Sequence, residues 1–292
     1  MNDHLLRVLD REAGIRGFAC VTTALSEEAI CRHHAAPMAG AVLSQGLTGA
    51  ALLGATLKVR QRMAVKVQGS GPSGKLAAES DAYGRVRGYV SAPDFASPQA
   101  VTPESMAAAI GHNGLLTVTK DVGLKDLYQG VVSLQSGRLD EELTHYLVRS
   151  EQIPSAVEIG VAVDENDWLT HAGGLLLQAL PGADEKRLRV LLERLDDLPP
   201  LATLLRDGET PYQTLAALFR DGEMSVLEER PLAFSCSCSR ERTRKALQMI
   251  GAAEIRSLMD EGQAVIECHF CHEEYIYGVE ELGEILADET AI

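Results

Sequence analysis

The first 180 residues alternate short apolar runs with segments in which apolar positions recur every three or four residues. Apolar runs bounded by Gly, Pro, Ser or Asp predict strands, and they cover Ile15–Thr23, Met63–Gln68, Arg85–Ser91, Leu115–Lys120, Gly130–Leu134, Val157–Val163 and Gly174–Leu180. The helical spacing predicts helices over Ser26–His34, Pro37–Lys58 and Leu139–Glu151, the first with Ser26 as its N-cap. Short turns join several strands, so we expect an α+β domain with a mixed or antiparallel sheet rather than a doubly wound fold.

Beyond Pro181 the chain becomes helical and acidic, with two apolar stripes separated by Pro199 and Pro200. The stripes consist of Leu188, Leu191, Leu192 and Leu195, and of Tyr212, Leu215, Leu218 and Phe219. Because helices of this length are marginal alone, we expect residues 181–231 to be a helical linker docked on a larger surface. The predicted organisation is a core domain over residues 1–180, this linker, and a small C-terminal domain over residues 232–292.

Charge narrows the classes of partner. The chain has 292 residues, and its 27 basic and 42 acidic residues give a formal charge of −15; such a field repels nucleic-acid phosphates and anionic lipids. The charged N-terminal sequence lacks the apolar run of a signal peptide, so we expect a cytoplasmic protein. Gly40–Leu57 approaches membrane-spanning length, but its polar residues and four glycines favour a buried core helix. Neither nucleic acid nor membrane is an expected partner.

A glycine-rich segment, Gly69–Lys75, fits two phosphate-binding patterns, G-x-x-x-x-G-K and G-x-G-x-x-G. The position that would offer a hydroxyl to Mg²⁺ is Leu76, however, and the residues that follow are typical of strand and turn rather than of a helix whose N-terminus could hold phosphate. We therefore interpret Gly69–Lys75 as a β-turn.

Other candidate ligands have weaker patterns. We expect Cys20 to be a buried strand thiol and Cys31 a helix thiol, although Cys31 with His33 and His34 could also bind a metal. Three further histidines have no partner at ligand spacing: His112, His145 and His171. A basic cluster is expected to be a solvated helix face, with a binding patch as the alternative; it contains Arg240, Arg242, Arg244 and Lys245.

The last quarter contains the motif Cys236-Ser-Cys238 and, after 29 intervening residues, Cys268-His-Phe-Cys271. Two such pairs can offer four thiolates to a tetrahedral Zn²⁺ at about 2.3 Å, which closes the coordination shell. A closed site is structural or sensory rather than hydrolytic. The flanking segments Ala264–Glu267 and Glu274–Tyr277 predict a hairpin with the Cys-x-x-Cys at its turn, and disulfides are not expected as permanent features of a reducing compartment.

Three other interpretations of the Cys-x-x-Cys are less favourable. A redox dithiol would sit at a helix N-terminus, which lowers the pKa of one thiol. A c-type haem attachment needs an exported chain. A deaminase needs Pro before the motif and an upstream His-x-Glu, whereas Glu267 stands there. His269 and His272 could compete as ligands, but four cysteines already saturate the ion.

The folding free energy of the C-terminal segment indicates that the metal has a structural role. A segment of this size reaches only about 3–5 kcal/mol of stability on its own, whereas structural zinc contributes on the order of 10–16 kcal/mol. We expect metal removal to unfold residues 232–292. The four thiolates also remain nucleophilic and can be oxidised to disulfides with loss of the ion. Loop-closure entropy favours the local bridges Cys236–Cys238 and Cys268–Cys271, the first of them strained and reducible.

These motifs resemble the heat shock protein 33 family, the redox-regulated 33 kDa chaperonins. The resemblance rests on FSCSCSRERTRKAL (234–247) and its spacing to ECHFCHEEYIYG (267–278), and on QGSGPSG (68–74), GVVSL…YLVRSEQIP (130–154) and AGGLLLQALP (172–181). It covers essentially the whole chain. It implies an α+β core, a helical linker and a zinc domain, with Cys236, Cys238, Cys268 and Cys271 as ligands and sensors.

The resemblance also implies a function. Reduced members hold one zinc; oxidation, often with heat, releases it, unfolds the zinc domain and linker, and produces a dimeric, ATP-independent holdase that passes clients to ATP-dependent foldases. We therefore expect a chaperone for unfolded proteins, with no catalytic residues. Two alternatives remain: a zinc-ribbon regulator of nucleic acid, which would need a basic face although no Lys or Arg follows Arg256, and a thiol-disulfide exchange protein.

Overall fold

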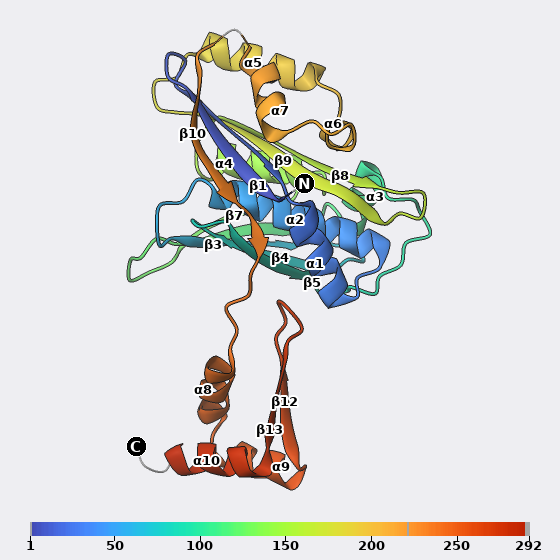
Figure 1. The fold of residues 1–292 in the computed structure, drawn as a ribbon, viewed down its shortest axis with the longest axis vertical. Helices are drawn as coiled ribbons and strands as arrows, with labels where there is room; N and C mark the ends of the chain where they lie inside the picture. Colours follow the sequence, from blue (N-terminus) through green and yellow to red (C-terminus); the bar gives the residue numbers. More distant parts are fainter. Residues whose placement is uncertain (1, 221, 290–292) are drawn as a thin grey trace. The chain divides into compact units, whose positions relative to one another are not determined.

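The computed structural model describes residues 2–220 and 222–289 (Figure 1). The chain forms two compact units, residues 1–235 and residues 236–292. The strands of the first unit are β1 (His4–Asp10), β2 (Ile15–Val21), β3 (Arg62–Gln68), β4 (Lys75–Asp81), β5 (Arg85–Val90), β6 (Leu115–Asp121), β7 (Tyr128–Ser133), β8 (Ser155–Val163), β9 (Leu169–Ala179), β10 (Met224–Pro231) and β11 (Ala233–Phe234). Its helices are α1 (Thr23–His33), α2 (Pro37–Gly54), α3 (Pro103–Ile110), α4 (Leu139–Arg149), α5 (Glu185–Asp197), α6 (Leu201–Arg206) and α7 (Pro211–Leu218).

Two sheets form the framework of the first unit. One has the strand order β10-β1-β2-β9-β8 with antiparallel pairing throughout. The other has the order β11-β5-β4-β3-β6-β7, in which only the short β11 runs parallel to its neighbour. The predicted α+β class with a mixed or antiparallel sheet is confirmed.

Helix α2 lies between the two sheets and fills the main core (Figure 1). Every residue from Met38 to Gly54 is buried, and two of its hydroxyls are satisfied within the helix: the Ser44 hydroxyl donates to the Gly40 carbonyl, and the Thr48 hydroxyl to the Ser44 carbonyl, both at 2.8 Å. Gly46 permits close packing, because a Cβ there would lie 2.6 Å from Leu76 Cδ1. The segment is thus the expected core helix, and no helix among the described residues is long and apolar enough to span a membrane.

Helices α5, α6 and α7 cover the outer face of the five-stranded sheet (Figure 1). Side chains from both layers form a second core, which contains Leu6, Val8, Ala13, Ile15, Ala19, Val21, Leu175, Leu177, Leu191, Leu201, Leu205, Leu215, Leu218 and Phe219. The prediction that the linker helices dock on a larger surface is therefore confirmed. The division into residues 1–180, 181–231 and 232–292 stays a prediction, because the compact first unit extends to Ser235.

The linker is not helical to its end. Residues 224–231, expected to be helical, form β10 and pair with β1 from Met224↔Asp10 to Pro231↔His4. The polar sequence of β10 has no strand-like alternation, and several of its side chains are exposed. Its conformation is decided by the open edge of β1, whose backbone groups it pairs. Strand β1 and helix α3 were also missed by the pattern.

The glycine-rich segment is the predicted turn, between β3 and β4. The backbone N–H of Gly71 donates to the Ile110 carbonyl at 2.9 Å and that of Ser73 to the Ala109 carbonyl at 3.0 Å. Leu76 is 2% exposed. Since these N–H groups are occupied by the protein backbone, the loop cannot present them to a phosphate.

Helix α1 begins three residues earlier than predicted, and the expected N-cap Ser26 is buried inside it. The cap is supplied from a distant residue: the Asp3 carboxylate accepts hydrogen bonds from the N–H groups of Ala24 at 3.1 Å and Leu25 at 2.7 Å. A cap so far away in sequence leaves no local signal.

We predict that Asp3→Ala lowers the free energy of unfolding of the first unit by about 1–2 kcal/mol, because the N–H groups of Ala24 and of the buried Leu25 lose their acceptor. Urea unfolding followed by the fluorescence of Trp168, the single Trp, measures the change. Glu28→Ala removes only an exposed pair with Arg32 on the same helix and should change stability by about 0.5 kcal/mol or less. Equal losses in both variants would contradict the capping role.

Candidate metal centre

The second unit is small and has a correspondingly small core. It contains α8 (Arg240–Ile250), α9 (Ala252–Asp260), β12 (Gln263–Glu267), β13 (Glu274–Gly278) and α10 (Val279–Glu289). The buried apolar side chains that pack together are Leu247, Ile255, Ala264, Tyr277, Leu282 and Ile285. Among the described residues, these six and a few partly buried apolar neighbours hold five elements, so this core supplies little stability by itself.

The Cys-x-x-Cys lies in the loop of the β12–β13 hairpin, as predicted. Backbone hydrogen bonds fold it into a tight turn: the N–H of Cys268 donates to the Glu273 carbonyl at 3.0 Å, and the N–H groups of Cys271 and His272 donate to the Cys268 carbonyl at 3.2 and 2.8 Å. His272 has a φ of 56°, a left-handed conformation in which His is enriched among non-glycine residues. The turn directs both cysteines to one side.

The Cys-x-Cys precedes α8, whose N-cap is Ser239. The Arg242 guanidinium donates to both the carbonyl and the hydroxyl of Ser237, each at 2.7 Å. This contact ties the residue between the two cysteines to the first turn of the helix. It orders a segment that has no regular secondary structure.

The structure brings the four cysteines of the two motifs together. The sulfur of Cys236 lies 3.7 Å from that of Cys268, the sulfur of Cys238 lies 3.3 Å from that of Cys271, and all four lie within 4.8 Å of one another. Tetrahedral ligands at about 2.3 Å from Zn²⁺ would be about 3.8 Å apart. The donor set and its spacing therefore fit a metal ion, while the role of each cysteine as a ligand stays a prediction.

Burial raises the pKa of the Cys271 thiol, and neighbouring thiols raise it further. Burial also raises the pKa of Cys268. Without a cation, these thiols hold their protons more firmly than ordinary cysteines, because burial penalises the thiolate. A bound cation would reverse this preference and release protons from the ligands.

Of the side chains beside the cysteines, Tyr275 was not singled out from the sequence, whereas His272 was considered there as a competing ligand. The Tyr275 hydroxyl donates a hydrogen bond to the Cys238 sulfur at 3.1 Å, and this contact raises the pKa of Tyr275. His272 Nδ1 lies 2.6 Å from a carboxylate oxygen of Glu267, so its ring has a partner other than a metal. Strand alternation places Tyr275 on the same face as the buried Tyr277, but only the tertiary structure shows that this face reaches a sulfur.

The other candidates from the sequence belong elsewhere. Cys20 is buried in β2, where burial raises the pKa of its thiol to about 12, and Cys31 is exposed on α1; both were predicted. Neither belongs to the metal-ligand group found among the described residues, nor do His33, His34, His112, His145 and His171. The basic cluster on α8 forms ion pairs within the unit, which join Arg240 to Glu281, Arg244 to Asp288 and Lys245 to Glu241 at 2.7 Å.

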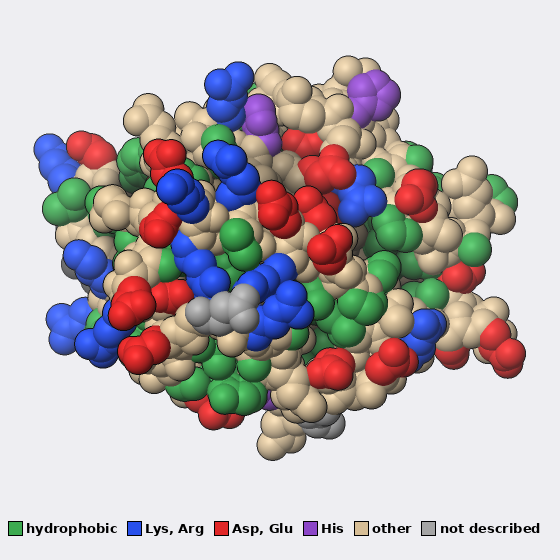
Figure 2. Space-filling model, turned by 90° about the horizontal axis from the view of Figure 1, so that it is seen from above, with side chains coloured by type: hydrophobic (Ala, Val, Ile, Leu, Met, Phe, Trp, Pro, Cys, Tyr) green, Lys and Arg blue, Asp and Glu red, His purple; other side chains and the backbone are tan. Residues whose placement is uncertain are grey.

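The face of the first unit that carries α5 and α7 shows basic and acidic side chains interspersed with apolar ones (Figure 2). Such a mixture lacks the single-sign field that attracts nucleic acid. Together with the ion pairs on α8, it favours a solvated surface over a binding patch.

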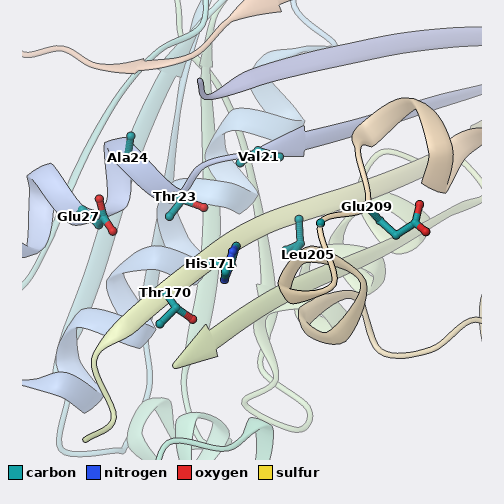
Figure 3. Close-up of a pocket in the computed structure, with 9 residues that line it drawn as sticks. Val21, Thr23, Ala24, Glu27, Thr170, His171, Leu205 and Glu209 are labelled. Atoms are coloured by element: carbon teal, nitrogen blue, oxygen red, sulfur yellow. The ribbon is translucent and has the colours of Figure 1, made fainter. Parts of the chain in front are cut away.

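A cavity of about 270 Å³ in the first unit lies where α1 and β9 meet the segment after α6. Glu27 and Glu209 lie toward opposite ends, with His171 between them (Figure 3). The hydroxyls of Thr23 and Thr170 donate to main-chain carbonyls of the sheet. Because these hydroxyls serve the backbone, the cavity is a seam between the linker and the core rather than a site with an activated nucleophile.

The chain is similar to known proteins over its whole length. The family model described as Hsp33 protein matches residues 3–278. A 33 kDa chaperonin of Geobacter sulfurreducens is 42% identical over 293 residues, which cover 100% of this chain and 97% of the relative. A 33 kDa chaperonin of Desulforamulus reducens is 43% identical, with 98% of each chain covered. The crystal structure of a 33 kDa chaperonin, a heat shock protein 33 homolog from Thermotoga maritima, matches with a TM-score of 0.90 and 30% identity over 99% of each chain.

We predict that Cys271→Ser abolishes stoichiometric zinc binding and unfolds residues 236–289, because three thiolates and a small core cannot replace the closed site. A chromogenic chelator measures zinc per chain, and hydrogen exchange measures order in the second unit. Cys31→Ser, in the first unit, should retain one zinc and full protection. An ordered second unit in the metal-free Cys271→Ser variant would refute the metal's structural role.

Proposed function

This chain belongs to the Hsp33 family, and from that premise we propose that it is a redox-regulated holdase, a chaperone that binds unfolding proteins without ATP after oxidation of a four-cysteine zinc centre. The convergence of four sulfurs from two distant motifs carries the proposal. Cys236, Cys238, Cys268 and Cys271 hold one Zn²⁺ in the reduced state. We assign the chain no substrate turnover and no catalytic residues.

The metal keeps the second unit folded because the unit's apolar core supplies little folding free energy by itself. A unit with six buried apolar side chains reaches only about 3–5 kcal/mol of stability without a metal. Structural zinc contributes on the order of 10–16 kcal/mol. Zinc loss therefore removes most of the free energy that keeps residues 236–289 folded. This large difference makes the site suitable as a switch.

Oxidation converts the four thiolates into two disulfides. In each pair one thiolate sulfur attacks a peroxide oxygen, the O–O bond breaks, hydroxide leaves, and the sulfur becomes a sulfenic acid. The second thiolate then displaces hydroxide from that sulfur and forms the S–S bond. Loop closure favours Cys236–Cys238 and Cys268–Cys271, although the closest sulfurs in the reduced centre belong to different motifs. We infer that local pairing follows loosening of the unit.

The covered face of the five-stranded sheet is the surface we propose that clients bind. Chain continuity links it to the metal centre, since β10 and β11 directly precede Cys236. Docking of the linker depends on a few leucines and Phe219, each worth roughly 1.5–3 kcal/mol before conformational entropy is subtracted. Undocking α5, α6 and α7 would expose the apolar side chains beneath them, and an extended patch of this kind is typical of protein-binding surfaces.

Two polar contacts also hold the linker. The Glu158 carboxylate on β8 accepts a hydrogen bond from the N–H of Leu201 at 2.9 Å and so caps α6. Arg187 of α5 lies 3.6 Å from the buried carboxylate of Asp10. These contacts fix the position of the helices, while the apolar layer supplies most of the free energy of docking.

The family resemblance supports further features of the proposal. The oxidised protein forms a homodimer and transfers its clients to ATP-dependent foldases in the cytoplasm. Size-exclusion chromatography of the reduced and oxidised forms tests the first of these features.

We predict that hypochlorite or peroxide with mild heat releases zinc, lowers hydrogen-exchange protection over residues 181–231, and enables the protein to suppress aggregation of a heat-unfolded client. Zinc release is followed with a chromogenic chelator and aggregation by light scattering. Aggregation suppressed equally by the reduced, zinc-loaded protein, or protection of the linker unchanged on oxidation, would contradict the switch.

We also predict that Gly160→Ala activates the reduced protein. A Cβ at Gly160 would lie 2.5 Å from the Ala202 backbone nitrogen, so α6 must move away from β8. The variant should keep its zinc yet suppress client aggregation. Gly174→Ala is the matched control, because its Cβ would press on Thr48 and Leu52 of α2, on the opposite face of the sheet. Activation by both variants would indicate general destabilisation rather than linker undocking.

A further inference from the structure

Strand β13 carries two tyrosines on one face, and their hydroxyls have different partners. The Tyr277 hydroxyl lies 2.6 Å from the Thr243 hydroxyl and donates to the Arg240 carbonyl at 2.7 Å. The Tyr275 hydroxyl donates to the Cys238 sulfur at 3.1 Å. The first tyrosine thus joins the hairpin to α8, whereas the second contacts the candidate metal centre.

The cysteines of the hairpin loop receive hydrogen bonds of a different kind. The Cys268 sulfur accepts them from the backbone of Phe270 and Cys271, and the Cys271 sulfur from the backbone of Glu273. Backbone donors belong to the turn and persist whatever the side chains are. The donor to Cys238 is a side chain, so a single substitution can remove it.

We propose that Tyr275 is a positioning residue that sets the rate at which Cys238 is oxidised. This inference rests on the proposed function, since it concerns how the same centre responds to oxidant. A hydrogen bond to a metal-bound thiolate stabilises the sulfur lone pair and lowers its nucleophilicity. Cys238 is half-buried, whereas Cys271 is only 4% exposed, so Cys238 is accessible to a small peroxide.

The oxidation step explains why the hydrogen bond matters. The Cys238 sulfur gives two electrons to one peroxide oxygen; an S–O bond forms, the O–O bond breaks, and hydroxide leaves. The sulfur becomes a poorer acceptor of the Tyr275 hydrogen bond as it gives up these electrons. The hydrogen bond is therefore stronger before the step than after it, and it raises the barrier.

The test compares Tyr275→Phe with Tyr277→Phe, since each loses one hydroxyl from the same strand. Zinc release by hydrogen peroxide in excess is followed with a chromogenic chelator, and a sulfenic-acid trap with mass spectrometry identifies the first cysteine oxidised. Zinc affinity by competition and the melting temperature report structural effects. Tyr275→Phe should release zinc about tenfold faster than the wild type, with Cys238 labelled first, whereas Tyr277→Phe should match the wild-type rate.

A wild-type rate in zinc-loaded Tyr275→Phe, or equal acceleration in both variants, would overturn the inference. Placing 3-fluorotyrosine at position 275 gives a second test, because this isosteric side chain is a stronger donor and should slow zinc release whether or not Tyr275→Phe loads zinc; an equal or faster rate would also overturn it. A wild-type protein that keeps its zinc in excess peroxide with mild heat would instead contradict the proposed function, so the two failures are distinguishable.

Discussion

The convergence of four cysteine sulfurs within 4.8 Å is the constraint on which the second unit depends. Two motifs separated by a helix pair and a strand must meet at one point, and six buried apolar side chains supply only a small part of the free energy needed to hold them there. A metal ion would account for the arrangement, because it would also offset the raised pKa values of the Cys268 and Cys271 thiols. In the proposed function the same thiolates are the groups that an oxidant attacks, so stability and sensitivity would arise from one set of atoms.

The first unit has a complementary construction. Its main core, built around α2, lies between two sheets, and its described residues include none between positions 181 and 231. Its second core depends on the linker, because six of its fourteen buried side chains lie between residues 181 and 231. A protein organised in this way could lose its linker layer and keep its main fold. The proposed chaperone needs this property, because it must expose a binding surface without unfolding entirely. Strand β10, paired along β1, lies between the linker helices and the cysteines in sequence, so it would connect the proposed loss of metal to the proposed undocking of the linker.

The hydrogen bonds around the sulfurs bear on the proposed rate of cysteine oxidation, as distinct from the stability that the metal provides. Backbone donors surround the hairpin cysteines, and a side-chain hydroxyl serves Cys238. Metal affinity depends mainly on the four ligands, whereas the rate of oxidation depends on how well each lone pair is stabilised and how accessible it is. In the proposed function, the centre would therefore bind metal firmly and still respond selectively to oxidant.

By itself, the sequence determined the α+β class, the buried helix α2, the hairpin around the Cys-x-x-Cys and the four-cysteine pattern, because periodicity and metal-ligand spacing are local properties. It did not reveal β1, α3 or β10, nor the Asp3 cap of α1, since these depend on edges and partners distant in the chain. The Tyr275–Cys238 contact was hidden for the same reason: alternation assigned the tyrosine to a face, but the position of Cys238 relative to that face follows from how α8 packs on the hairpin. Tertiary structure alone decided which apolar surface the linker covers, because burial of a face depends on its neighbour.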